Sequence, residues 1–360
     1  MESNKKNELK AVDFFCGAGG MTYGMSLAGI KVLAGIDIDP KCKETYTINN
    51  PETKYIQKDI YELTEEELAE VTNIRKNDDS LIFIACSPCQ FWTKISTEKE
   101  KSKETKDLLV QFQRFVEWFK PGYLVVENVP GLKKHKKEKV LEGFITFLRE
   151  ESYELDDGFI KANNYGVPQT RERYLLMASR VSDRITLPAE EPDENLILRN
   201  FIGTHNGFPA IDAGHRDNSD FMHTAANLSE KNKRRIRITP KDGGDRSNWK
   251  DNPELQIDAY KGKDHIFRNV YGRMYWDKPA STITTKFHSL SNGRFGHPEE
   301  DRAISLREGA TLQTFPKDYK FIGSSIDSIS RQIGNAVPPE LARRIGKEIV
   351  ENYMKEKFQD

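Results

Sequence analysis

The sequence predicts an α/β fold with a doubly wound, mostly parallel sheet, joined to a second, smaller domain of irregular structure. Through about residue 180, short apolar runs typical of buried strands alternate with stretches that repeat their apolar residues every three or four positions. Strands that alternate with helices favour parallel pairing. After residue 181 this periodicity fades, and glycine, asparagine, aspartate and histidine become frequent between Asn195 and Asn269.

The individual elements follow from the same patterns. Apolar runs predict strands over residues 11–15, 31–36, 55–57, 81–84, 123–126 and 174–178. Helices are expected from Met21 onward and over residues 65–75, 107–119, 138–151 and 340–355. In a sheet of this kind, ligands bind beyond the carboxyl ends of the strands. The residues that directly follow each predicted strand are therefore the first candidates for a functional site.

The composition indicates a reducing compartment and no membrane span. The 360 residues include four cysteines without regular spacing, and the first ten residues are polar and charged, so we expect no signal peptide. No run of 18 apolar residues is present. The net charge is −1, so any contact with nucleic acid must come from local basic patches. We expect a cytoplasmic protein.

The most informative stretch is the turn that contains Cys89. The fourth apolar run leads into Ala85-Cys86-Ser87-Pro88-Cys89-Gln90, in which Pro88 cannot continue a strand ladder or a helix interior. The turn would present the sulfur of Cys89 beside a polar, lysine-rich loop over residues 93–106. We interpret Cys89 as a nucleophile and the loop as a cover for its substrate. A buried apolar thiol, a redox pair with Cys86 and half of a zinc site are the alternatives.

A glycine loop and three acidic residues follow other predicted strands. The loop, Cys16-Gly17-Ala18-Gly19-Gly20, would let the backbone approach a ligand. Asp37 lies 20 residues after Gly17, where a carboxylate can bind a ribose hydroxyl. Asp59 is placed to receive an adenine amino group, and Glu127 would be costly to bury without a purpose. The ordinary alternatives are a tight turn, a helix cap, a turn residue and an exposed loop acid.

Two arginines precede the sixth apolar run. Arg171 and Arg173 alternate with Glu172, so in a strand both would face one side. Two guanidinium groups suit an anionic or hydrogen-bond-rich substrate, and a salt-bridged sheet face is the alternative. Near the C-terminus, Gly334-Asn335 before two prolines has the character of a second loop built for ligand approach. An ordinary helix start explains it equally well.

A basic segment in the irregular half is the candidate for contact with nucleic acid. It runs over residues 231–246, around Gly243-Gly244, and its candidate DNA-binding residues are Lys233, Arg234, Arg235, Arg237 and Arg246. Such a segment suits a phosphate backbone and the edges of bases in a groove. We expect Arg235, Arg237 and Arg246 to contact bases. A solvated run of charges is the alternative, and no histidine or cysteine cluster here has metal-ligand spacing.

Taken together, these stretches resemble the cytosine-C5 DNA methyltransferases of bacterial restriction–modification systems. Six motifs occur in the family's usual order over nearly the whole chain: residues 13–20, Pro88-Cys89-Gln90, Glu127-Asn128-Val129, residues 169–173, residues 273–284 and residues 332–338. Asp37 stands where glutamate is commoner, Ile38 where an aromatic residue is frequent, and Cys86 where glycine is frequent. Trp92-Thr93 replaces a frequent Phe-Ser. These departures remove no group that the chemistry needs.

The resemblance implies a Rossmann-like fold, the cofactor S-adenosylmethionine (SAM) and no metal. It implies a SAM-binding catalytic domain over residues 1–187, a target-recognition domain over 188–330, and a segment over 331–360 that returns to the catalytic domain. Cys89 would add to C6 of a flipped-out cytosine, with Glu127 at N3 and Arg171 and Arg173 at O2. The SAM pocket implied by the family comprises Phe15, Gly17, Ala18, Gly19, Gly20, Asp37, Ile38, Asp59, Ile60, Leu108, Asn335 and Ala336.

The implied partner is double-stranded DNA, contacted by Gln90 and the basic segment, and no membrane is expected. We expect a monomer that is functionally paired with a restriction endonuclease. A methyltransferase acting on cytosine C5 of transfer RNA is the closest rival, although the long, glycine-containing variable region favours DNA. A non-catalytic DNA-binding regulator is disfavoured by the intact Cys89 and Glu127. A dinucleotide oxidoreductase is disfavoured by Thr22, which stands at the third glycine of that fingerprint.

Overall fold

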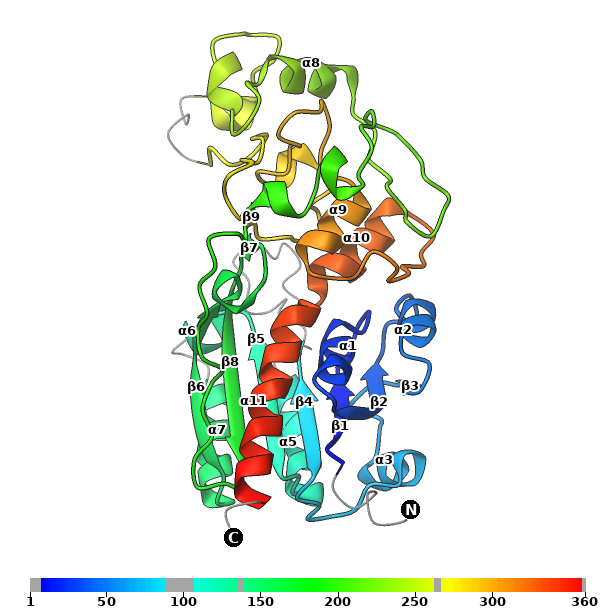
Figure 1. Ribbon diagram of the computed structural model, residues 1–360, viewed down its shortest axis with the longest axis vertical. Coiled ribbons are helices and arrows are strands. Elements are labelled where there is room, and N and C mark those ends of the chain that lie inside the picture. The colour runs from blue at the N-terminus through cyan, green and yellow to red at the C-terminus, as the bar shows by residue number, and fades with distance from the viewer. Residues whose placement is uncertain (1–7, 88–106, 135–138, 262–266, 358–360) are drawn as a thin grey trace. The chain divides into compact units, whose positions relative to one another are not determined.

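The structure is a computed structural model that describes residues 8–87, 107–134, 139–261 and 267–357 of the chain. Over these ranges, no helix combines the length and the apolar character needed to cross a membrane. The chain divides into two compact units (Figure 1). The first unit comprises Met1–Lys161, Glu172–Glu191 and Val337–Asp360, and the second comprises Ala162–Arg171 and Pro192–Ala336. Compared with the expected boundaries, residues 162–171 and 331–336 group with the second unit, and residues 188–191 group with the first.

A seven-stranded sheet forms the centre of the first unit. Its strands are β1 (Lys10–Phe14), β2 (Lys31–Asp37), β3 (Lys54–Gln57), β4 (Leu81–Ala85), β5 (Tyr123–Asn128), β6 (Glu154–Lys161) and β8 (Glu172–Ser179). Their order is β3-β2-β1-β4-β5-β8-β6. The first five strands run parallel, whereas β8 lies antiparallel to both β5 and β6. The predicted doubly wound, mostly parallel sheet is confirmed.

Helices cover both faces of this sheet (Figure 1). They are α1 (Gly20–Leu27), α2 (Lys43–Asn49), α3 (Glu65–Thr72), α5 (Leu108–Phe119), α6 (Gly131–Lys134), α7 (Val140–Glu150) and α11 (Pro339–Lys357). α1 packs against α11, and α5 packs against α3 and α7. In Figure 1, α11 crosses in front of the sheet, while α5 and α7 lie behind it. The C-terminal helix therefore belongs to the same unit as the first strand.

The apolar face of α5 explains why this helix docks on the sheet. Its buried residues recur at three- and four-residue spacing and include Phe112, Phe115 and Phe119. The ring of Phe112 meets that of Phe14 in β1 edge-on, with ring centres 5.2 Å apart. Burying each such side chain contributes roughly 1.5–3 kcal/mol, so this cluster dominates the packing of that face.

The order of the strands reverses between β1 and β4, which creates a topological switch point. The register pairs Phe14 of β1 with Ala85 of β4, and Ala85 with Val126 of β5. On the other side, Phe14 pairs with Ile36 of β2. The segments that follow these strands therefore leave the sheet at one level, where ligands bind in folds of this type.

The strand β6 was not expected from the sequence. Its residues, ELDDGFIK, combine two aspartates with a glycine, so they lack the alternation and the β-branched residues that mark a strand. It is an edge strand whose pairing with β8 supplies the regularity that its sequence lacks. Tertiary pairing has overridden a weak local preference here.

The second unit has little regular structure in its described part. It contains the short strands β7 (Gln169–Thr170) and β9 (Ala280–Ser281), which pair parallel, and the helices α8 (Glu230–Ile238), α9 (Leu306–Leu312) and α10 (Ile326–Asn335). Single turns of 3₁₀ helix include Arg246–Trp249 and Asp258–Tyr260. The loss of periodicity in this half of the sequence is the expected sign of such an irregular unit.

The close packing of α1 on α11 depends on glycine at position 24. A Cβ atom there would lie 2.3 Å from the carbonyl oxygen of Pro339 and 2.4 Å from the Cβ of Ala342. Gly24→Ala should therefore lower the free energy of unfolding of the first unit by about 1–3 kcal/mol, because backbone has to move. Chemical denaturation measures this change.

Gly143→Ala is the matched control, since it places the same methyl group in another helix, α7. A Cβ at Gly143 would meet nothing within 4 Å. Alanine should raise stability there by roughly 0.5–1 kcal/mol, because it restricts the unfolded chain and favours the helix. Equal effects of the two substitutions would show that the α1–α11 contact is not the cause.

Candidate active site

The glycine loop after β1 has the backbone shape that its sequence predicts. Phe15, Gly17 and Gly19 have φ angles of 63°, 52° and 90°, in the left-handed region. Gly19 then caps α1, which begins at Gly20. A Cβ at Gly17 would meet nothing within 4 Å, so the space beside the loop is open. Ala18 is buried beneath the turn.

Asp37, at the end of β2, is tied to the glycine loop. Its Oδ2 accepts a hydrogen bond from the backbone N–H of Gly17 (2.8 Å), and its Oδ1 accepts one from Asp39 N–H (2.8 Å). Burial raises the pKa of this carboxyl, and the two N–H groups oppose the rise. Each oxygen has a second acceptor position, so the carboxylate retains capacity for further donors. The neighbouring Ile38 side chain is 60% exposed.

The other residues expected around the cofactor have separate environments. Asp59 is partly exposed, and its Oδ1 accepts a hydrogen bond from Tyr61 N–H (3.0 Å), as a turn residue does. Ile60 and Leu108 are 4% and 8% exposed and belong to the hydrophobic core of the first unit. Both are apolar and buried, so neither side chain offers a polar contact.

Asp13 was not singled out by the sequence, although it lies inside the first motif. Its side chain is fully buried in β1, and Oδ2 accepts a hydrogen bond from the hydroxyl of Thr22 (2.7 Å). The Thr22 hydroxyl also lies 3.0 Å from that of Tyr46. Oδ1 has no partner among the described residues. Burial raises the pKa of Asp13 to about 7. The signal that could have found it is an acid in an otherwise apolar strand.

Asn128 holds the chain that leads toward the predicted nucleophile. Its Nδ2 donates to the carbonyl oxygen of Ser87 (3.2 Å) and to the Ser87 hydroxyl (2.9 Å). The preceding residue, Cys86, has a thiol whose pKa is raised well above its ordinary value by burial and then by the nearby Glu127. Cys89 and Gln90 lie outside the described residues. Asn128 of β5 therefore fixes the position of Ser87, just after β4 and two residues before Cys89 in the sequence.

Glu127 forms an ion pair with Arg173. The Nε of Arg173 lies 3.0 Å from Oε1 of Glu127, and the two side chains are 14% and 8% exposed. Arg173 reaches across because β8 runs antiparallel beside β5, with Glu127 opposite Leu175. The Nη1 of Arg173 donates to the carbonyl oxygen of Glu172 (2.7 Å). A buried acid is thus held beside a cation, which keeps the cost of its burial low.

The expectation that Arg171 and Arg173 share one face of a strand is wrong. Arg171 lies between β7 and β8 and belongs to the second unit. Its guanidinium is buried and donates to the carbonyl oxygens of Ile283 (3.1 Å), Gly334 (3.3 Å) and Ala336 (3.3 Å). The Arg171 carbonyl still accepts a hydrogen bond from Ala162 N–H (2.8 Å), in the register of the β6–β8 pair, although β8 itself begins at Glu172.

Asn335 and Ala336 also lie in the second unit, at the end of α10. Asn335 is exposed, and Ala336 is 8% exposed. The contacts of Arg171 fix the backbone of this segment. A Cβ at Gly334 would lie 2.3 Å from the carbonyl carbon of Thr284, which shows how tightly α10 ends.

The basic segment divides into buried and exposed residues. Arg235 is 7% exposed and donates to the carbonyl oxygens of Leu255 and Gln256, which contradicts its expected contact with bases. Arg246 is 4% exposed and lies over the ring of Tyr260. Its burial likewise contradicts its expected contact with bases. Arg237 is exposed. Lys233 and Arg234 form surface ion pairs with Glu230 (2.8 Å) and Glu254 (2.6 Å).

The fold is that of the Rossmann-like, SAM-dependent methyltransferases. A solved structure of a candidate DNA modification methyltransferase from an Escherichia coli prophage superimposes with a TM-score of 0.70, at 22% identity, over 96% of this chain and 99% of that one. The Dnmt2 methyltransferase of Schizosaccharomyces pombe gives a TM-score of 0.60 at 17% identity, over 98% of this chain and 100% of that one. At these identities the likeness establishes the fold alone.

Sequence comparison then defines the family. A family model for C-5 cytosine-specific DNA methylases matches residues 9–351, and the chain belongs to this family. The type II methylase M.HgiDII of Herpetosiphon aurantiacus is 39% identical over 344 residues, 94% of each chain. The type II methyltransferase M.Sau96I of Staphylococcus aureus is 29% identical over 96% of this chain and 76% of its own. The protein is a DNA (cytosine-5) methyltransferase, as the resemblance predicted. Among the described residues, no cluster of three histidine, cysteine or acidic side chains could hold a metal ion.

The buried Asp13 makes the stability of the first unit depend on pH near neutrality. Its pKa is about 7 when folded against an ordinary 3.8, so the folded state binds more protons between these values. Stability therefore falls as the pH rises through this window, by on the order of 4 kcal/mol in full. Asp13→Asn stays neutral at every pH. Its thermal midpoint should exceed that of the wild type at pH 8.5, with the advantage shrinking toward pH 5.

Thr22→Val is the companion variant, because the Thr22 hydroxyl lowers the pKa of Asp13. Removing that donor should raise the pKa of Asp13 further, so the pH range over which stability falls should extend to higher pH. Thermal melts of the three proteins at several pH values between 5 and 8.5 make the comparison. A difference in thermal midpoint between the wild type and Asp13→Asn that stays constant with pH would contradict this account.

Proposed function

We propose that this protein is the modification enzyme of a type II restriction–modification system, which uses SAM to methylate C5 of a flipped-out cytosine within a specific sequence of double-stranded DNA. The observation that carries the proposal is the shared register of β1, β4 and β5. It brings the glycine loop, the approach to Cys89 and Glu127 to one edge of the sheet. The likeness to M.HgiDII over nearly the whole chain supports the restriction–modification setting.

The residues at the switch point fit SAM. The left-handed backbone at Phe15, Gly17 and Gly19 forms a cradle, and the open space beside Gly17 is space that a side chain there would fill. Asp37 would bind the ribose hydroxyls with its remaining acceptor capacity, and the exposed Ile38 would contact the adenine. Gly20, Asp59, Ile60 and Leu108 would complete the pocket. When bound, SAM supplies an electrophilic methyl group.

Covalent catalysis explains the need for a cysteine. C5 of cytosine is a poor nucleophile, and addition of the Cys89 thiolate to C6 forms an S–C6 bond that makes C5 enamine-like. After C5 has gained the methyl group, a base removes the C5 proton, the S–C6 bond breaks and the thiolate leaves. Asn128 holds Ser87, which precedes Cys89 by two residues in the sequence.

Glu127 and Arg173 would act on the same base. Glu127 would hold or protonate N3, which stabilises the negative charge that builds on the ring as sulfur adds. Arg173 positions Glu127 through its Nε, and no contact between described residues uses its Nη2, which would bind O2. Arg171 would act as a positioning residue instead, because its guanidinium holds the α10 end that bears Asn335 and Ala336.

The second unit would recognise the DNA. The target carbon is inaccessible within a duplex, so the nucleotide must be flipped out while the flanking duplex is held. Lys233, Arg234 and Arg237 are exposed or half-buried cations on α8 and suit contacts with phosphates, and Gln90 would approach the flipped base's neighbours. We further propose a monomer that works in the bacterial cytoplasm and is paired with a restriction endonuclease.

Replacing the proposed nucleophile tests the function directly. Cys89→Ser should abolish methyl transfer to duplex DNA while SAM binding persists, because the glycine loop and Asp37 do not need the thiol. Transfer of labelled methyl groups, followed by bisulfite mapping, detects the product and its position. Duplex DNA and transfer RNA of matched concentration are compared as substrates.

Cys86→Ser is the control, since the Cys86 thiol has a raised pKa and is held neutral. This variant should keep most of its activity. Near wild-type turnover by Cys89→Ser would overturn the mechanism, and methylation of RNA in preference to DNA would overturn the substrate assignment. A large loss in Cys86→Ser would revive the interpretation of the two cysteines as a functional pair.

The cofactor proposal has its own test at Asp37. Asp37→Ala should weaken SAM binding by about 1–3 kcal/mol, the cost of losing a charge-assisted hydrogen bond. Asp39→Ala is the matched control, because the Asp39 carboxylate accepts only a local bond from Lys41 N–H (3.0 Å) among the contacts described, and SAM affinity should persist. Calorimetric titration gives both values, and equal losses would remove Asp37 from the pocket.

A further inference from the structure

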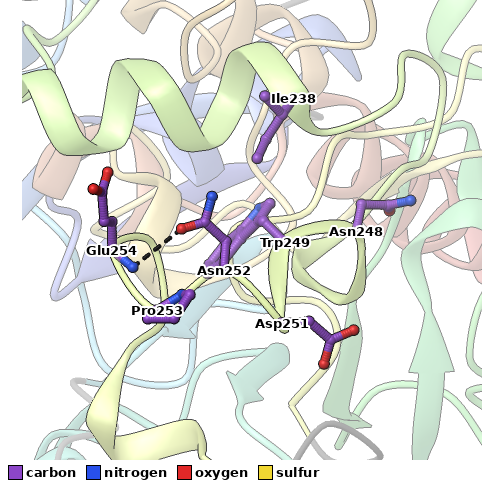
Figure 2. Close-up of a pocket in the computed structure, with 7 residues that line it drawn as sticks. All are labelled: Ile238, Asn248, Trp249, Asp251, Asn252, Pro253 and Glu254. Atoms are coloured by element: carbon purple, nitrogen blue, oxygen red, sulfur yellow. Dashed lines mark hydrogen bonds between the residues drawn. The ribbon is translucent and has the colours of Figure 1, made fainter.

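A hollow in the second unit lies beside the end of α8 (Figure 2). Its volume is about 760 Å³, and it is lined by Ile238 and by residues from the segment 248–254. Trp249, Pro253 and the 46%-exposed Ile238 supply apolar surface. Asn248, Asp251 and Glu254 add polar groups. None of these residues was singled out by the sequence.

Trp249 gives the hollow a fixed wall. Its indole is 4% exposed, and Nε1 donates to the hydroxyl of Thr239 at the end of α8 (3.1 Å). The guanidinium of Arg235 lies 5.3 Å from the centre of the Trp249 ring. Arg235 also donates through Nε to the carbonyl oxygen of Leu255 (2.8 Å), just beyond the hollow. α8 and the lining segment are thereby clamped together.

The lining segment is also braced within itself. Asp245 caps the turn at its start, with Oδ1 accepting a hydrogen bond from Ser247 N–H (2.9 Å). Asn252 Oδ1 accepts one from Glu254 N–H (3.1 Å), which Figure 2 shows as a dashed line. The carboxylate of Glu254 is paired with Arg234 (2.6 Å). These side chains are engaged in holding the loop.

The side chains of Asn248 and Asp251 differ from these, because neither forms a hydrogen bond or an ion pair with another residue of the described part of the chain. Both are exposed, and in Figure 2 they extend on the side of the loop away from Glu254. A braced loop thus presents one amide and one carboxylate beside an apolar wall. Side chains placed on a rigid support lose little entropy when they bind, which suits them to recognition.

The charge of the surrounding segment suits DNA. From Glu230 to Lys261 there are nine basic and six acidic residues, an excess of three positive charges in a chain whose net charge is −1. Exposed cations such as Arg237 and Lys250 flank the hollow and can hold phosphates. The groups inside it have the chemistry of base readout: an asparagine amide pairs with N6 and N7 of adenine, a carboxylate accepts from N4 of cytosine, and apolar surface contacts the thymine methyl group.

We infer that this hollow receives base edges of the target DNA and that Asn248 and Asp251 determine part of the recognised sequence. The inference rests on the proposed function, in that the DNA substrate is a duplex methylated at a specific sequence. In this inference Asn248 and Asp251 contact the bases, whereas Arg235, Trp249 and Asn252 hold the loop that carries them. This division gives the buried Arg235 a structural role within an otherwise exposed basic stretch.

Methylation of a pool of duplexes, randomised around the target cytosine and read by bisulfite sequencing, tests the inference. Asn248→Ala and Asp251→Ala should each relax the preference at one base position by about 5- to 150-fold, while the preference at other positions persists. Asp258→Ala is the matched control, an exposed acid of the same segment that pairs with Lys261 (2.7 Å) and does not line the hollow. Its sequence preference should equal that of the wild type.

Two results would overturn the inference. One is an unchanged sequence preference in both Asn248→Ala and Asp251→Ala. The other is a loss of rate that is uniform across all sequences, which is the behaviour of a phosphate contact. Either result leaves the proposed function standing, provided that the wild type methylates cytosine in the pool. A wild type that methylates no duplex DNA overturns the proposed function and this inference with it.

Discussion

The register of three parallel strands fixes the geometry on which the chemistry of the first unit depends. Because Phe14, Ala85 and Val126 lie side by side, the next residues of each strand emerge at one level. β4 is buried along its whole length, so a slip by one residue would move every side chain to the opposite face. The antiparallel β8 completes the arrangement, since its register beside β5 places Arg173 next to Glu127.

The second unit is held together by a different interaction, namely buried arginines that bind backbone carbonyl groups. Irregular chain leaves many carbonyls without a partner, and each must be satisfied when buried. Arg273 is fully buried and donates to the carbonyl oxygens of Thr239, His297, Glu300 and Ile236. Arg307, in α9, likewise donates to the carbonyl oxygens of Phe221 and Tyr319, and burial lowers its pKa to about 10. Five donors in a rigid fork make arginine suited to this role.

The sequence could predict the parts of the structure that repeat. Strands β1, β4 and β5 follow from the apolar runs over residues 11–15, 81–84 and 123–126, and the candidate residues follow from the ends of those runs. It could not predict β6, whose regularity comes from its neighbour, or the burial of the Arg171 guanidinium against three carbonyl groups. Nor could it separate Arg235 from Arg237, two positions apart on α8, because burial of a cation depends on which carbonyl groups surround it. The sequence gives the number of charged residues, but their packing in the folded chain determines which of them are exposed to a ligand.

Burial and nearby acids also limit the reactivity of the cysteines in the described part of the chain. Burial raises the pKa of the Cys16, Cys42 and Cys86 thiols, and nearby carboxylates raise it further: Asp37 acts on Cys16 and Cys42, and Glu127 on Cys86. A thiolate is the form that attacks carbon, binds zinc or exchanges disulfides. These three cysteines are therefore poor nucleophiles and poor ligands, which argues against a redox or zinc role for the Cys86–Cys89 pair. The same carboxylates that would hold the cofactor and the base therefore disfavour thiolate formation at these three positions.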